Sequence, residues 1–207
     1  PKSMAVFAYC SENKLQQQFL TLQKHPEVKL CFTPALGLRN DGTIKEVANN
    51  GKEEKVISAS DVVRGGGSFI PTASLFMERE VISNIPTWFI GAPVGDYYIQ
   101  VWGSNNGALY ISGKTCIYRV QAEGSWSSTR RVKSKEQLET EIFAHITTIK
   151  QIDMNEGDRA YMLAIEYSNI AYTFLINKYK KEFLYYIKKS WSTQPNVNKM
   201  QSRFYFF

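Results

Sequence analysis

The pattern of hydrophobic residues changes near Ser134, and this change most constrains the fold of the 207-residue chain. Before that point, segments with helical spacing and segments with strand-like alternation follow one another, which is typical of an α/β domain. After it, apolar residues recur only at helical spacing, as at Leu138, Ile142 and Ile149. We therefore predict an α/β part up to about residue 130, followed by a C-terminal α-helical hairpin.

The α/β part begins with a helix and then a strand. Leu15, Phe19 and Leu22 are spaced by four and three residues, which places them on one face of a helix. Apolar and polar residues alternate over 28–32, which predicts a half-buried strand. Residues 43–60 are polar and charged, and there we predict a solvated excursion of the chain.

The C-terminal part is predicted to contain one helix from Ser134 and a second, longer helix over about 157–189. The apolar stripe of the second helix continues from Ala164 to Ile187 near a period of 3.6 residues. No stretch of about 18 apolar residues occurs in the sequence, so no transmembrane helix is expected.

The cysteine and histidine counts argue against several classes of site. The three cysteines (Cys10, Cys31 and Cys116) are odd in number, far apart in the sequence and free of any Cys-x-x-Cys pair. This pattern argues against a disulfide framework or a structural zinc site and fits a reducing compartment. The two histidines, His25 and His145, argue against a His-based triad or a His-rich metal site.

The positive charge of the chain is concentrated in its C-terminal third. The formal net charge is +6, and residues 130–207 hold 13 basic against 8 acidic residues. Lysines and aromatic residues are interleaved over 178–189. Such a helix can lie on an anionic membrane surface, or it can pack its aromatic stripe on the protein and leave its lysines in water. Both interpretations remain open, and nucleic-acid binding is disfavoured because no nucleic-acid motif accompanies the charge.

Three short segments could carry chemistry. Asp96 stands at an expected helix start, where a carboxylate can cap the helix or act as a general base in a cleft. Tyr118 and Arg119 end an expected strand shortly before Trp126, so the guanidinium could hold a phosphate or sugar while the indole stacks on a ring. The hydroxyls of Thr72 and Ser74 could bind a ligand or satisfy the local backbone.

Taken together and in order, several segments resemble the second half of a bacterial family 2 glycosyltransferase, which has the GT-A nucleotide-sugar fold. The resemblance covers roughly residues 11–130. Its segments are Asn13-Lys14-Leu15-Gln16, Gln18, His25-Pro26-Glu27-Val28, Cys31-Phe32, Ile70-Pro71-Thr72-Ala73-Ser74, Pro86, Trp88, Pro93-Val94-Gly95-Asp96-Tyr97, Gly107, Tyr118-Arg119 and Gly124-Ser125-Trp126-Ser127.

The resemblance implies an inverting transfer of a sugar from a nucleotide-diphosphate donor to an acceptor hydroxyl. It implies that Asp96 is the catalytic base and that a divalent cation, Mg or Mn, neutralises the leaving group. Gln121 stands where the family often has a metal-binding histidine, so we assign no metal ligand in this chain and expect the ligands mostly outside it. The substrate-binding residues implied by the resemblance or by the local chemistry are Thr72, Ser74, Tyr97, Tyr118, Arg119 and Trp126.

The sequence departs from the family at its N-terminal end. The family has a nucleotide-binding half that ends in an acidic pair, and no Asp-x-Asp or adjacent Asp pair occurs here. We therefore expect residues 1–10 to be a remnant strand of that half, 11–130 the acceptor-side catalytic part and 131–207 a helical extension. Either the chain is a fragment, or residues are missing between Cys10 and Ser11. In either case we expect the chain by itself to bind the donor poorly and to be inactive.

The function expected from the resemblance is synthesis of a cell-surface polysaccharide in bacteria. The partners would be a nucleotide sugar and a saccharide or lipid-linked saccharide acceptor, at a cytoplasmic location on the inner face of the membrane. The alternative is a non-catalytic module, derived from a glycosyltransferase, that binds a glycan or a membrane. The apolar end over 203–207 is expected to dock on the protein body or to form a homo-oligomer.

Overall fold

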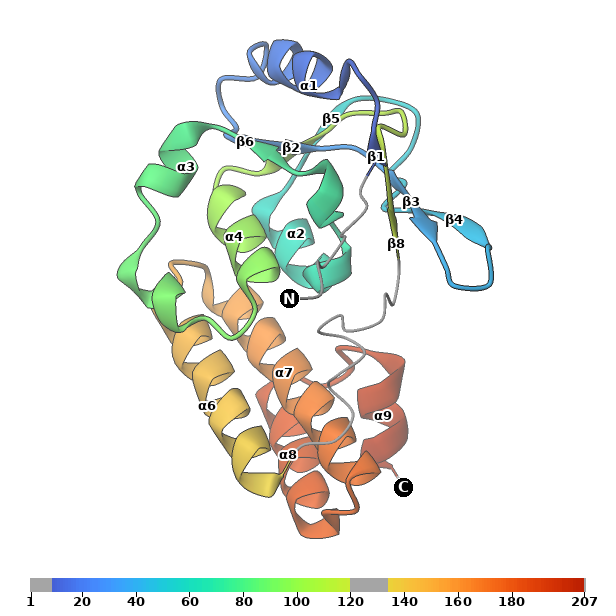
Figure 1. Ribbon diagram of the computed structural model, residues 1–207. Coiled ribbons are helices and arrows are strands. Elements are labelled where there is room, and N and C mark those ends of the chain that lie inside the picture. Colours follow the sequence, from blue (N-terminus) through green and yellow to red (C-terminus); the bar gives the residue numbers. More distant parts are fainter. Residues whose placement is uncertain (1–8, 120–133, 207) are drawn as a thin grey trace, which may run out of the picture. The chain divides into compact units, whose positions relative to one another are not determined.

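The computed structural model describes residues 9–119 and 134–206, which divide into two compact units (Figure 1). Among the described residues, unit 1 consists of 9–85 and 96–119, and unit 2 consists of 86–95 and 134–206. The ten residues Pro86–Gly95 therefore belong to the helical unit although they interrupt the α/β part of the sequence.

The described strands of unit 1 form two four-stranded sheets, each with parallel and antiparallel pairs. The first sheet has the order β1 (Tyr9–Cys10), β8 (Cys116–Arg119), β3 (Ala35–Leu38), β4 (Ile44–Val47). The second has the order β5 (Lys55–Ile57), β7 (Ala108–Tyr110), β2 (Leu30–Phe32), β6 (Phe76–Met77). The helices of unit 1 are α1 (Lys14–Leu22), α2 (Ala59–Gly65), α3 (Arg79–Ser83) and α4 (Gly95–Gly103), with short 3-10 turns η1 (Gly66–Ser68) and η2 (Thr72–Ser74). The predicted α/β character of this part is confirmed, and its sheets are mixed.

The central strand β2 is buried on both faces, so the prediction of a half-buried strand is wrong. On one face Cys31 packs with Leu22 of α1 and with Leu109 of β7. On the other face Leu30 and Phe32 belong to a cluster that includes residues of α2 and of the segment after η1. Helical segments therefore cover both faces of the strand. For a strand covered in this way, the alternation of polar and apolar residues does not predict which side chains are exposed.

The helix α1 presents its polar face to the interior, contrary to the amphipathic pattern. Leu15 is 62% exposed and Phe19 49% exposed, whereas Gln18 is fully buried. The side-chain amide of Gln18 donates to the main-chain carbonyl of Ser74 over 2.7 Å. A buried hydrogen bond of this kind needs a polar side chain on the inner face. Leu15 and Phe19 are therefore turned outward, while Leu22 at the end of the predicted stripe stays buried.

The polar segment 43–60 is not a structureless excursion. It contains β4, which pairs with β3, and β5, which pairs with β7. Most side chains of both strands are exposed, so the segment is solvated as predicted while its main chain extends the two sheets. The polarity of the side chains therefore predicted correctly that the segment is exposed, but it did not predict that its main chain pairs with β3 and β7.

Unit 2 is helical. Its described elements are η3 (Thr87–Gly91), α6 (Lys135–Gln151), α7 (Glu156–Ile176), α8 (Lys180–Thr193) and α9 (Lys199–Tyr205). Ser134 precedes α6 as the N-cap of a capping box. Its hydroxyl accepts from the main-chain nitrogen of Gln137, and its own main-chain nitrogen donates to the side-chain oxygen of Gln137. Buried side chains from α6 and α7, among them Ile142 and Phe174, form the core against which α8 packs.

The second helix predicted over 157–189 is broken into α7 and α8. The chain leaves the helical conformation after Ile176, and Lys178 has a φ of 66° in the left-handed region. The side-chain amide of Asn177 donates to the Thr173 carbonyl, which satisfies one free group at the helix end. The break lets α8 fold back on α7, and α6 lies beside α7 (Figure 1). Among the described residues, the C-terminal part therefore contains more helices than the two of the predicted hairpin.

The aromatic C-terminal end docks within unit 2. The Phe204 ring stacks on Tyr172 with centroids 6.1 Å apart, and Tyr205 stacks on Trp191 at 4.4 Å. Phe206 remains 74% exposed although its ring meets Trp191 edge-on. Docking on the protein body accounts for Phe204 and Tyr205, and a homo-oligomer through this end stays a prediction. In the part of the chain that the structure describes, every helix is too short or too polar to span a bilayer.

Candidate active site

The centre of the candidate site is Asp96, the second residue of α4. Its Oδ1 accepts a hydrogen bond of 2.8 Å from the main-chain nitrogen of Tyr97. Its Oδ2 accepts from the Thr72 hydroxyl over 3.4 Å, which links α4 to η2. Both side chains are exposed. The carboxylate is thus held at the start of the helix, where the helix dipole favours a negative charge, and it remains open to a ligand.

Two buried glutamines hold the segment that carries Thr72. Gln18 of α1 donates to the carbonyl of Ser74, and Gln100 of α4 donates to the carbonyl of Ile70 over 3.1 Å. Both amides are fully buried. The segment is therefore fixed at its two ends by side chains from different helices. Sequence reasoning gave neither glutamine a role, although Gln18 belongs to the motif series.

Ser74 faces the interior rather than solvent. It is fully buried, and its hydroxyl donates to the Pro71 carbonyl over 3.0 Å and accepts from the Thr33 main-chain nitrogen over 3.4 Å. These bonds close η2 and join it to the chain just after β2. Its prediction as a substrate-binding residue stays a prediction, and the role that the geometry displays is that of a brace beneath Thr72.

Tyr97 braces the other side of Asp96. Its hydroxyl donates to the Val63 carbonyl over 2.8 Å, which ties the start of α4 to α2. The side chain is half-buried. A ligand could reach the ring, whereas the hydroxyl already has its acceptor.

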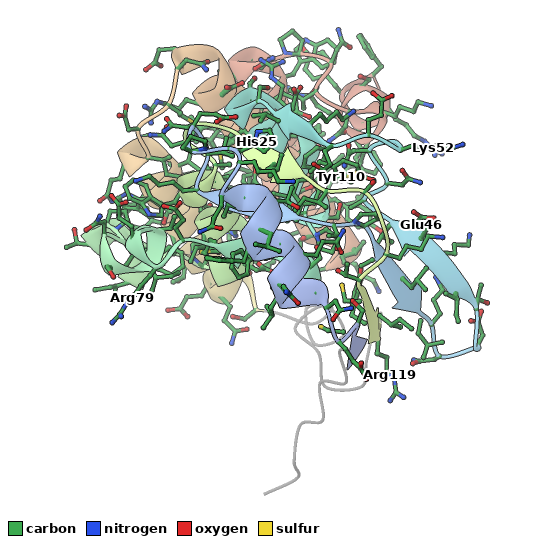
Figure 2. The ribbon with its side chains drawn as sticks, turned by 90° about the horizontal axis from the view of Figure 1, so that it is seen from above. His25, Glu46, Lys52, Arg79, Tyr110 and Arg119 are labelled. Atoms are coloured by element: carbon green, nitrogen blue, oxygen red, sulfur yellow. The ribbon has the colours of Figure 1, made fainter. Side chains whose placement is uncertain are left out.

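The strand β8 brings Tyr118 and Arg119 to the first sheet, and η2 packs against this strand. Burial raises the pKa of the Tyr118 phenol, so this hydroxyl stays protonated and able to donate near neutral pH. Arg119 is exposed at the end of β8, and Figure 2 shows its side chain pointing outward from that edge. Successive side chains of a strand leave opposite faces, so Tyr118 and Arg119 point to opposite sides of the first sheet.

A further buried link lies at the start of β8, at the opposite end of the strand from Arg119. The hydroxyls of Thr33, after β2, and Thr115, before β8, are 2.6 Å apart and hydrogen-bonded in the interior. This link joins the two sheets next to η2. Trp126 lies outside the described residues, as does Gln121, and their predicted roles stay predictions.

The chain's own residues do not form a metal centre in the part that the structure describes. Among residues 9–119 and 134–206, no three His, Cys, Asp or Glu side chains come together as a group that could hold a metal ion. Among these residues, the hydrogen-bond partners of Asp96 are the Thr72 hydroxyl and the Tyr97 main-chain nitrogen. The described residues do not fit the Mg or Mn ion that the resemblance implies, and that ion stays an expectation.

Comparison with solved structures supports the fold. The chain is similar to S. aureus TarS, residues 1–349, solved in complex with UDP-GlcNAc, with a TM-score of 0.55. The alignment covers 95% of this chain and 57% of that chain at 11% sequence identity. The chain therefore spans little more than half the length of that structure, and the likeness at this identity concerns the fold alone. No family model matches the sequence, and no curated protein matches it.

Proposed function

We propose that the chain is the acceptor-side part of an inverting glycosyltransferase of the GT-A, family 2 type. The observation that carries the proposal is the fold shared over 95% of the chain with a protein crystallised with a nucleotide sugar. The exposed Asp96 carboxylate, fixed between Thr72 and the start of α4, supports the same reading. The motif series of the sequence agrees with both.

In the proposed reaction Asp96 takes the proton of an acceptor hydroxyl. The acceptor oxygen attacks the anomeric carbon of the donor sugar from the face opposite the leaving group, and the bond to the nucleotide diphosphate breaks. The proton ends on the carboxylate and the electron pair on the diphosphate. We assign to the Arg119 guanidinium the binding of the donor diphosphate or of an anionic acceptor, because a guanidinium can form two parallel hydrogen bonds to phosphate oxygens.

Thr72 orients the Asp96 carboxylate, while Gln18, Gln100, Ser74 and Tyr97 keep the two segments in place. Tyr118 and Trp126 are proposed to line the sugar-binding cleft. The acceptor is proposed to be a saccharide or lipid-linked saccharide of a bacterial cell-surface polysaccharide, handled at the cytoplasmic face of the membrane. We route no step through a metal ion, because the described residues do not form a site for one.

The experiment uses the longest natural protein that contains this chain. Release of nucleotide and transfer of sugar are measured with a panel of UDP-, GDP- and dTDP-sugars. General-base catalysis contributes about 10²- to 10⁴-fold, so Asp96→Asn should lower the transfer rate by that factor. Asp61→Asn is the matched control, because Asp61 is likewise exposed in the first turn of a helix of unit 1. Normal transfer by Asp96→Asn would disprove the assignment of the base.

We propose as a second function that α8 binds an anionic membrane surface. Lys181, Leu184, Tyr185 and Lys188 are all exposed and are spaced as one stripe of the helix. Lys189 lies instead over the Tyr167 ring, 4.8 Å from its centroid. The exposed stripe thus combines two cations with two apolar or aromatic side chains, the composition of an interfacial helix.

Sedimentation with lipid vesicles tests this second function. Vesicles that contain phosphatidylglycerol should bind the chain more tightly than vesicles of phosphatidylcholine alone. Each surface lysine contributes about 1 kcal/mol, so Lys181→Gln with Lys188→Gln should weaken binding by about 30-fold. The control pair Lys150→Gln with Lys199→Gln removes the same charge from exposed positions elsewhere in unit 2. Equal loss in both pairs would show that net charge, not α8, governs binding.

A further inference from the structure

A pocket of unit 1, about 250 Å³ in volume, lies at the C-terminal end of α4. Its lining includes Lys29, which precedes β2, and Asn105 and Asn106, which precede β7. The strands β2 and β7 are parallel, so the pocket lies at their amino ends. Asp96 stands at the opposite end of α4, about 10 Å away along the helix axis.

Trp102 provides an aromatic wall for this pocket. Its side chain is half-buried, and the indole nitrogen donates to the Val81 carbonyl over 3.0 Å. That bond fixes the orientation of the ring and uses its one donor. What Trp102 offers a ligand is therefore its ring, the surface that packs against the apolar face of a sugar.

Three asparagines supply polar groups around the tryptophan. Asn84, Asn105 and Asn106 are exposed, and within residues 9–119 and 134–206 their side-chain amides make no hydrogen bond. Asn105 and Asn106 are the central residues of a turn that the Gly107 main-chain nitrogen closes by donating to the Ser104 carbonyl. Each amide offers a donor and an acceptor, which is the pairing that vicinal hydroxyls require.

The charges of the pocket neutralise one another. The Lys29 Nζ and the Glu80 Oε2 are 2.6 Å apart, and they are the charged pair of the lining. A paired lysine is a poor receptor for a phosphate or a carboxylate, because binding an anion would leave Glu80 facing a second negative charge. The pocket therefore favours an uncharged polar ligand. Its volume lies below that of most pockets for drug-sized molecules, which matches one ring better than a whole nucleotide.

We infer that this pocket is a second saccharide site, which binds one neutral sugar residue of a glycan on Trp102 and the amides of Asn84, Asn105 and Asn106. The inference goes beyond the proposed reaction, because Asp96 is not part of the pocket. A glycan held here would stay attached to the protein independently of catalysis.

The experiment follows Trp102 directly by ¹⁹F NMR of protein that carries 5-fluorotryptophan. The chain has four tryptophans, and the Trp102 resonance is assigned by its loss in Trp102→Phe. The probes are tetra-N-acetylchitotetraose, maltotetraose and mannotetraose, with inorganic phosphate and UDP as charged comparators. At least one neutral tetrasaccharide should shift the Trp102 resonance saturably, while phosphate and UDP leave it unchanged.

Variants separate this pocket from the catalytic site. Asn105→Ala with Asn106→Ala should weaken saccharide binding by about tenfold or more, since two hydrogen bonds of about 1 kcal/mol each are lost. The control pair Gln16→Ala with Gln17→Ala changes two exposed amides of α1 and should bind as the wild type does. Asp96→Asn should also bind unchanged, so failure of the catalytic proposal and failure of this one are distinguishable.

Four outcomes would overturn the inference. They are a Trp102 resonance that no tetrasaccharide shifts, a response to phosphate or UDP in place of saccharide, wild-type affinity in the Asn105 and Asn106 double variant, and loss of binding in Asp96→Asn.

Discussion

The side-chain amide of Gln100 donates to the main-chain carbonyl of Ile70 over 3.1 Å, and both residues are fully buried. This bond fixes the segment before Thr72 to the helix that carries Asp96. The candidate site therefore depends on a polar contact in the interior of unit 1. Such contacts are costly to break, because the carbonyl left behind has no water to replace its donor.

Gln100→Glu tests this contact through its pH dependence. A neutral carboxylic acid can still donate to the Ile70 carbonyl, whereas a buried carboxylate cannot and is also desolvated. Burial raises the pKa of the introduced carboxyl, so the variant should be near wild-type stability below about pH 4. It should then lose about 1.4 kcal/mol per pH unit above that until the folded carboxyl ionises. Urea unfolding at several pH values measures this, with exposed Gln17→Glu as the control. Equal stability of wild type and Gln100→Glu at pH 8 would contradict the prediction.

Thr72→Val tests whether Thr72 acts through Asp96. The hydrogen bond between them is long and exposed, so its loss should change the free energy of unfolding by less than about 0.5 kcal/mol. The transfer rate should fall by about 3- to 10-fold because the carboxylate loses an orienting donor, and Thr72→Ser should retain the wild-type rate. In the Asp96→Asn background Thr72→Val should have no further effect. A full additional loss there would mean that Thr72 contacts the substrate itself.

Cys31 makes the chain sensitive to alkaline pH. Burial raises the pKa of its thiol from about 9 to about 12. Between these two pKa values the folded chain keeps the thiol proton, whereas the unfolded chain has lost it. The contribution of the buried thiol to the free energy of unfolding is therefore complete below about pH 9. It then declines by about 1.4 kcal/mol per pH unit up to the folded pKa. Cys31→Ala removes this decline, so its stability deficit relative to wild type should shrink between pH 8 and pH 11. Exposed Cys10→Ala serves as the control, and a constant deficit for Cys31→Ala would count against the prediction.

Cys10 and Cys116 should form a disulfide when the chain is oxidised. They are register partners on the antiparallel strands β1 and β8, and the bond from the Ser11 nitrogen to the Thr115 carbonyl makes them a non-hydrogen-bonded pair. In such pairs the Cα atoms are about 4.5 Å apart, within disulfide range. Diamide should therefore give a monomer that is about 2 Da lighter, with Cys31 still free by peptide mapping. Loss of the product in Cys10→Ser and its retention in Cys31→Ser are expected, whereas a bridge to Cys31 would refute the register of β1.

Some of the fold could be predicted because the signals are local. The Ser134 capping box and the change to helical spacing mark the start of α6 without reference to any distant residue. The order of helical and strand-like segments up to residue 130 likewise predicted an α/β unit. Local composition did not predict that β4 forms a hairpin with the preceding strand β3, or that β5 pairs with the distant strand β7, because a polar strand and a polar loop look alike.

The buried side of α1 could not be predicted for a different reason. Its orientation depends on Gln18 meeting the Ser74 carbonyl, 56 residues further along the chain. The spacing of apolar residues cannot predict a hydrogen bond to so distant a residue. The break at Lys178 is similar, since lysine has no preference for a left-handed conformation and the reversal depends on the packing of α8 against α7. For the candidate site, the sequence proposed Asp96 and Thr72, whose side chains lie in contact, and it overlooked the amides of Gln18 and Gln100 that hold the segment of Thr72.

The outward stripe of α1 has a consequence for how the molecules behave toward one another in solution. Leu15, Phe19 and Leu20 are each about half exposed or more, so the helix surface attracts other apolar surfaces. The net charge of +6 opposes such encounters while the ionic strength is low. Salt at about 0.1 M shortens the range of that repulsion to about 10 Å. The colloidal stability of the chain should therefore fall as salt is added, even where its conformational stability does not change.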